Sequence, residues 1–100
     1  MPFEDRSLRN RLSENQVLHL HPDILEETVG EEGETIIYSG FFRNNADIDT
    51  PDGCIIRRTI VREIAGKKNM EIMYGKGETS VFSCIWNNRT ITEYRFSRKI

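Results

Sequence analysis

The sequence predicts an all-β fold, an antiparallel meander of six or seven strands that forms a sandwich or a small barrel. Two similar segments, 33–44 and 77–88, both open on Gly-Glu-Thr and run into β-branched and aromatic residues, which is the composition of a strand. A third run, 54–64, is rich in Ile, Val and Thr. The similarity of the first two segments is compatible with a duplication and also with a shared strand pattern, and the sequence leaves both open.

The chain begins with a polar stretch, 1–15, in which Leu8 and Leu12 lie four residues apart. That spacing allows one short helix with a narrow apolar stripe, so we expect a short N-terminal helix or arm here. Residues 16–21 fit a short strand and a helix start equally well. The 100 residues are predicted as a single domain, with the β-domain over 16–100.

Residues 24–29 allow two interpretations. Pro22 and Gly30 stand where a helix would start and stop. A strand would instead pair through the turn 30–33 with the first similar segment. The second half of the chain favours a strand by analogy, because there 70–74 leads through a Gly-rich turn, 75–77, into the second similar segment.

The remaining elements follow from turn residues. Asn, Asp, Pro and Gly predict a loop over 44–53, and the longest strand is expected over 54–64 with a turn over 65–69. A two-residue turn at Asn87-Asn88 would form a last hairpin with a final strand over 90–96, and would set Trp86 beside Arg89 as a cation–π pair. Both faces of this hairpin are mixed in polarity, which is why a sandwich or barrel is expected.

The predicted core consists of the apolar residues on these strands. They are Ile36, Tyr38, Phe42, Ile56, Ile60, Ile72, Val81, Ile85, Trp86, Ile91 and Phe96. The apolar share of 37% and the charged share of 30% predict a thin core under a highly charged surface.

Charge is unevenly distributed along the chain. Residues 1–53 hold twelve acidic residues and four arginines, whereas 54–100 hold ten basic residues and four acidic ones, for a net charge of −2. Either the two halves neutralise each other in the fold, or the basic half meets an anionic partner. The two cysteines, Cys54 and Cys84, do not belong to a Cys-x-x-Cys motif, so we expect reduced thiols and a cytoplasmic protein. Because the sequence has no apolar run of about 20 residues, we expect that the protein does not enter a membrane.

No assembled catalytic set is visible, so the chain is predicted not to be an enzyme and to need no cofactor. His19 and His21 lack further ligands for a metal. The acidic run from Asp47 to Asp52 lacks the closing Glu of a calcium loop and is interpreted as a turn. Neither pattern predicts a metal site.

The leading functional hypothesis is therefore a binding module that contacts a protein or a second copy through its sheet faces or edges. The alternative is single-stranded nucleic acid, bound where arginines and aromatic residues share a sheet face. A third hypothesis is a small barrel that holds an apolar ligand. The candidate binding residues, all in the second half, are Arg57, Arg58, Arg62, Trp86, Arg89, Tyr94 and Arg95.

Overall fold

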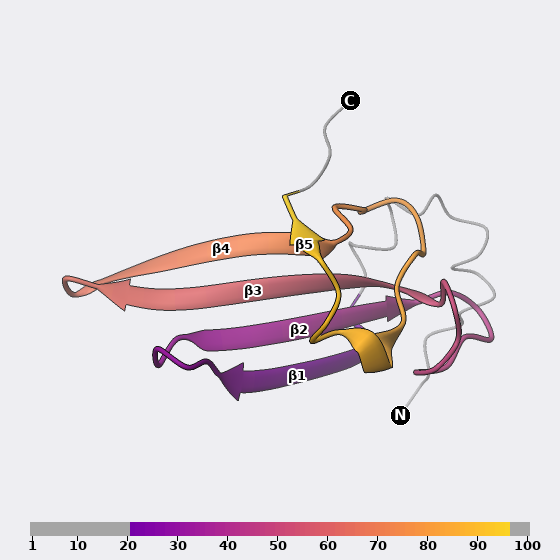
Figure 1. Ribbon diagram of the computed structural model, residues 1–100, viewed down its shortest axis with the longest axis horizontal. Coiled ribbons are helices and arrows are strands. Elements are labelled where there is room, and N and C mark those ends of the chain that lie inside the picture. Colours follow the sequence, from indigo (N-terminus) through magenta and orange to yellow (C-terminus); the bar gives the residue numbers. More distant parts are fainter. Residues whose placement is uncertain (1–20, 97–100) are drawn as a thin grey trace.

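One open antiparallel sheet organises the structure, a computed structural model that describes residues 21–96 (Figure 1). Its strands lie side by side in chain order, from β1 to β5. They are β1 (Ile24–Val29), β2 (Thr35–Phe42), β3 (Cys54–Ile64), β4 (Lys67–Gly75) and β5 (Tyr94–Arg95), with a 3₁₀ helix η1 (Trp86–Asn88) between the last two. The all-β antiparallel prediction is confirmed.

The sheet does not close, and five strands are found in residues 21–96, so neither the six or seven strands nor the sandwich or barrel is confirmed. The predictions made for residues 1–20, a short helix or arm followed by a strand or helix start, lie outside the described residues. Within 21–96 the 3₁₀ turn is the only helix, and no helix there is long and apolar enough to span a membrane.

The strand interpretation of residues 24–29 is confirmed, β2 lies within the segment 33–44, and β3 has its predicted bounds. Residues 24–29 form a strand, paired with β2 through the turn 30–33. β3 spans 54–64, and the turn after it is shorter than expected. Ala65 (φ 53°) and Gly66 (φ 80°) form a two-residue turn with both residues at positive φ, which matches the twist of a hairpin, so β4 begins directly at Lys67.

The prediction of a last hairpin with its turn at Asn87-Asn88 is wrong. Residues 77–88 do not form a strand beside β4, because Cys84 and Trp86 are buried against Phe42 and Cys54 instead. In this segment only an isolated bridge, between Cys84 and Cys54, pairs with a strand. Instead of turning at Asn87-Asn88, the chain winds into η1, crosses the sheet and returns to pair β5 with the end of β4.

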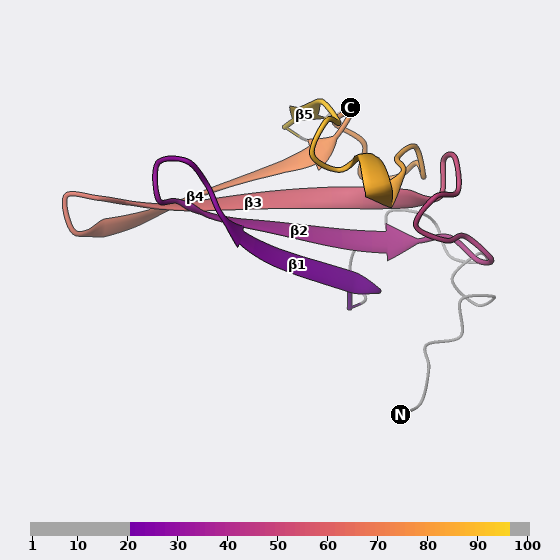
Figure 2. The same ribbon diagram turned by 60° about the horizontal axis from the view of Figure 1, so that its bottom comes forward.

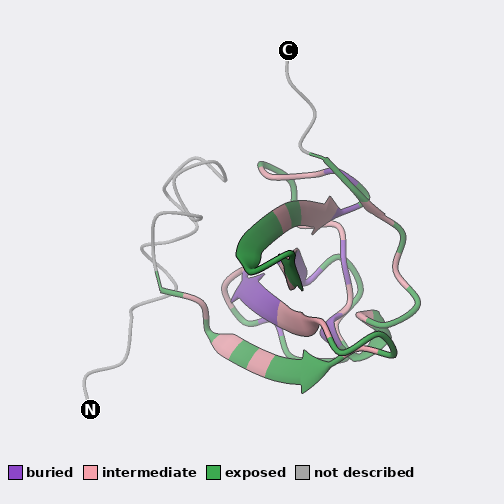
Figure 3. Ribbon diagram, turned by 90° about the vertical axis from the view of Figure 1, so that its left-hand side faces the viewer, coloured by how far each residue is buried: buried purple, intermediate pink, exposed green. Residues whose placement is uncertain are grey.

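A consequence of this path is that the sheet has two unequal ends (Figures 1 and 2). Residues 76–93 pack on the end that holds the loop 43–53, at the right of Figure 1. The two hairpin turns, 30–33 and 65–66, project from the opposite end, where the sheet is a single layer. Figure 3 shows the contrast, with β1 largely exposed and the C-terminal half of β2 buried.

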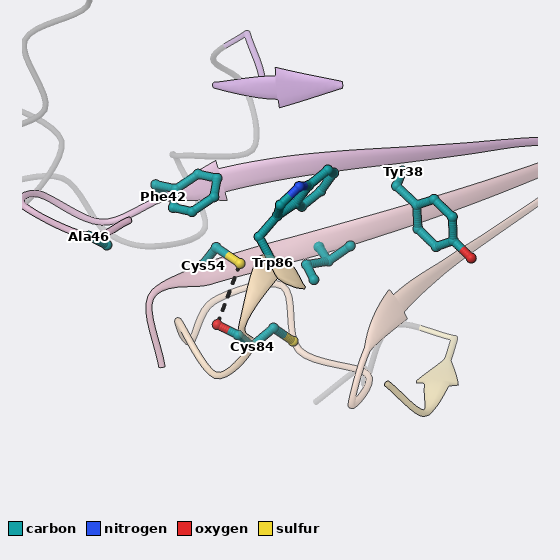
Figure 4. Packing of buried hydrophobic residues seen from close by; sticks show 7 residues of the cluster. Tyr38, Phe42, Ala46, Cys54, Cys84 and Trp86 are labelled. Carbon is teal, nitrogen blue, oxygen red and sulfur yellow. Dashed lines mark hydrogen bonds between the residues drawn. The ribbon is translucent and has the colours of Figure 1, made fainter. Parts of the chain in front are cut away.

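The main core lies on one face of the sheet, beneath η1. There Trp86 packs against Phe42, with ring centroids 6.4 Å apart, and next to Cys54 and Cys84 (Figure 4). A smaller cluster, Phe41 and Ile55 with Tyr74 and Phe82, forms on the opposite face. We call the two faces the Trp86 face and the open face.

Five predicted core residues are buried, and two more are half-buried. The buried ones are Tyr38, Phe42, Ile56, Ile60 and Trp86, and the half-buried ones are Ile36 and Ile85. The prediction is wrong for four others, which are exposed: Ile72, Val81, Ile91 and Phe96. Val81 and Ile91 belong to the connection that replaced the hairpin, and Ile72 lies on the open face.

Candidate functional site

The seven candidate binding residues do not form one surface. Alternation along the strands places Arg57 and Arg95 on the open face and Arg58, Arg62 and Tyr94 on the Trp86 face, where packing also places Trp86 and Arg89. On that face the two aromatic rings are covered, since Trp86 is only 3% exposed and Tyr94 is half-buried.

Arg89 is held by an acidic residue of the first half. Its Nε and Nη2 each donate to one carboxylate oxygen of Glu26 at 2.8 Å, while the guanidinium lies 4.8 Å from the centroid of the Trp86 ring. The predicted cation–π pair is therefore present, though η1 rather than a hairpin brings it about. The hydrogen bonds from Arg89 lower the pKa of Glu26, and the same contact raises the pKa of Arg89.

Arg58 is part of the packing. Its guanidinium lies 4.4 Å from the centroid of the Tyr94 ring, and its Nη2 is 3.4 Å from the Met73 sulfur. Its Nε is buried with no hydrogen-bond partner. Tyr94 in turn donates its hydroxyl to the Arg89 carbonyl at 2.7 Å, and burial raises the pKa of that hydroxyl. These arginines fill the space between the sheet and the chain that covers it.

The remaining candidates have local partners as well. The Arg62 Nη1 lies 3.9 Å from the Glu71 Oε1, and the Arg95 Nη2 lies 2.6 Å from the Glu93 Oε1. The Arg57 guanidinium lies 5.3 Å from the centroid of the Phe41 ring. Binding of single-stranded nucleic acid needs accessible rings beside unpaired cations, so it stays a prediction that a salt titration with an oligonucleotide would test.

The sequence reasoning missed an apolar surface on the open face. Two rows of side chains cross four strands at the projecting end of the sheet. The outer row is Val29, Thr35, Val61 and Met70, and the inner row is Glu27, Ile37, Thr59 and Ile72. Glu27 is the one charged member.

Several of these side chains are far more exposed than a core would allow. Val29 is 73%, Met70 65% and Ile72 41% exposed, and Leu25 on the same face is 58% exposed. The signal in the sequence was the spacing of Leu25 and Val29 within a strand, and of Met70 and Ile72 within another. It could be interpreted only once the register put the two pairs on the same face.

The hairpins that carry this surface have opposite charge. Residues 22–42 contain six acidic residues and no Lys or Arg. Residues 54–75 contain five basic residues and only Glu63 and Glu71 as acids. Because β1 and β4 lie on opposite sides of the β2–β3 pair, the sheet has an acidic margin and a basic one.

The acidic loop after β2 forms turns. The Asp47 carboxylate accepts the Ile48 N–H at 2.7 Å, and the Thr50 hydroxyl accepts the Asp47 N–H at 2.8 Å. The Asn87 amide donates to the Asp49 carboxylate, which ties the loop to η1. Among residues 21–96 no three His, Cys, Asp or Glu side chains gather as metal ligands.

Cys54 and Cys84 are free, buried and adjacent, and the Cys54 sulfur donates to the Cys84 carbonyl at 3.4 Å. Burial, with the second thiol beside it, raises the pKa of Cys54 from 9.0 to about 12. Burial also raises the pKa of Cys84. Such thiols are poor nucleophiles because the thiolate is the reactive form.

We therefore expect both cysteines of the folded protein to resist a disulfide reagent at about pH 8, with the Cys54 thiolate about a thousandfold scarcer than in the unfolded chain. Two thiols should react at once when denaturant is added. Above pH 9 the unfolded state loses thiol protons that the folded state keeps, so stability should fall as the pH rises toward about 12. Rapid reaction of the native protein would contradict this packing.

Comparison with known proteins found no matching family model, and no curated protein or solved structure with significant similarity to the chain.

Proposed function

We propose that this chain is a non-enzymatic interaction module that binds protein through its open face. The observation that supports the proposal is the exposure of Val29 on β1 and of Met70 and Ile72 on β4, with the half-buried Ile37 and Val61 on the two strands between them. A contiguous apolar surface of this kind on a small soluble fold marks an interaction site. Burying one such side chain fully contributes about 1.5–3 kcal/mol, so several together suffice to hold a partner.

A sheet face is favoured over a sheet edge. The outer edge of β4 from Lys67 to Met73 has no strand partner among residues 21–96, because β5 pairs only with Tyr74 and Gly75. That edge carries Lys67 and Lys68 at its free end. Charged residues discourage a further strand from pairing there. The two rows of the open face carry one charged side chain, that of Glu27.

Two adjacent residues of β4 test the proposal. Met70 and Asn69 are both exposed and point to opposite faces, Met70 to the open face. Met70→Cys and Asn69→Cys would each carry a benzophenone, attached through the new thiol because the native cysteines are buried. We expect irradiation in an extract of the native cells to give a protein adduct from position 70 and none from 69. Equal adducts, or none, would refute the open face as the binding site.

A further inference from the structure

We infer that the partner is a second copy of this chain, and that two open faces pack about a twofold axis parallel to the strands. This inference rests on the proposed function and names the partner of the same surface. What points to a second copy is that the surface is complementary to itself, in apolar character and in the arrangement of its charges.

The charges lie at matching levels along the sheet. Val29 of β1 and Met70 of β4 stand in the same row. Glu31 follows Val29 by two residues, and Lys68 precedes Met70 by two. Beyond the apolar surface, therefore, an acidic turn and a basic strand end lie at the same level but at opposite margins of one molecule.

The direction of the symmetry axis decides which charges meet. A twofold axis along the strands keeps the projecting ends together and places β1 of one copy over β4 of the other. Glu31 then stands opposite Lys68, twice in the dimer. An axis across the strands would instead place acidic β1 over acidic β1 and basic β4 over basic β4. Since like charges across an interface are costly, the first arrangement is selected.

The packing that results is a familiar one. With the axis along the strands, the two sheets lie nearly aligned, and aligned sheets differ by about 30° because of their twist and pack about 10 Å apart. Two copies would thus form the second layer that one chain lacks. The surface is four strands wide, with about 4.8 Å between neighbouring strands, and about six residues long. The contact area on each copy, measured in the plane of the sheet, is therefore about 400 Å², which indicates a weak dimer.

Charge reversal on the full chain tests the inference, with sedimentation velocity over about 1 µM to 1 mM protein as the measurement. We expect the wild-type protein to pass from monomer to dimer. Glu31→Lys and Lys68→Glu should each raise the dissociation constant about tenfold, because both symmetric contacts become repulsive. Both residues are exposed, so the fold is preserved. An equimolar mixture of the two variants should recover wild-type association.

The other outcomes separate this inference from the proposed function. A wild-type chain that stays monomeric throughout, while the probe at position 70 captures a protein of different mass, overturns the second copy and leaves the interaction module standing. A monomer with no adduct refutes both. A dimer whose dissociation constant is unchanged in both charge variants, or in Met70→Lys, overturns the arrangement of the two faces.

Discussion

Replacing Trp86 by alanine is expected to lower the free energy of unfolding by about 3–5 kcal/mol. The indole is 3% exposed, packs on Phe42 and supports the Arg89 guanidinium on its other side. Its removal leaves a cavity and takes away the surface on which the Arg89–Glu26 pair rests. Against a total stability of about 5–15 kcal/mol, such a loss is visible in urea unfolding followed by circular dichroism.

Ile91→Ala is the matched control, since Ile91 lies in the same covering segment and is 80% exposed. Its stability should stay within about 0.5 kcal/mol of wild type. Similar losses in the two variants would show that the covering segment as a whole, and not the indole, holds the core.

Gly40→Val is expected to cost about 3 kcal/mol, the upper end of what overpacking does. A Cβ at this position would come within 2.8 Å of the Trp86 ring and 2.8 Å of the Ile24 side chain. Valine normally favours a strand, so its propensity predicts stabilisation, and only the close approach of Trp86 and Ile24 predicts a loss of stability. Chemical denaturation of the variant shows whether its free energy of unfolding falls or rises.

The cause can be isolated by combining Gly40→Val with Trp86→Phe. If the indole is what the valine meets, the smaller ring should relieve part of the penalty, and the double variant should be more stable than the sum of the single effects by about 0.5–3 kcal/mol. Strict additivity would place the strain at Ile24 instead.

Local composition was sufficient for β2 and β3, whereas it left residues 24–29 open between a strand and a helix. β1, β2 and β3 have β-branched residues between turns of Gly, Asn and Asp, and they pair with their neighbours in sequence. The second half could not be predicted in this way. Residues 77–88 have nearly the composition of 33–44, but Cys84 and Trp86 pack on Phe42 and Cys54, far away in the sequence, instead of pairing with β4. Tertiary packing of this kind cannot be predicted from a local sequence pattern.

The candidate site shows the same division. The association of Arg89 with Trp86 was visible from their spacing, but the binding of Arg89 to Glu26, which lies 63 residues away, was not. The open face was hidden for another reason. Leu25 and Met70 are ordinary strand residues in the sequence, and only the register of four strands shows that their neighbours on that face are apolar too.

The segment that covers the Trp86 face comes after all four long strands in the chain. During synthesis at about 5–20 residues per second, Trp86 is added about 1–4 s after Ile64, the end of β3. Over that interval β4 is still being made, so the β3–β4 hairpin cannot pair from its start, and Phe42 and Ile56 have no cover from η1. Pairing of β1, β2 and β3 therefore does not by itself shield the core from aggregation, because η1 completes that core only after Trp86 has been added.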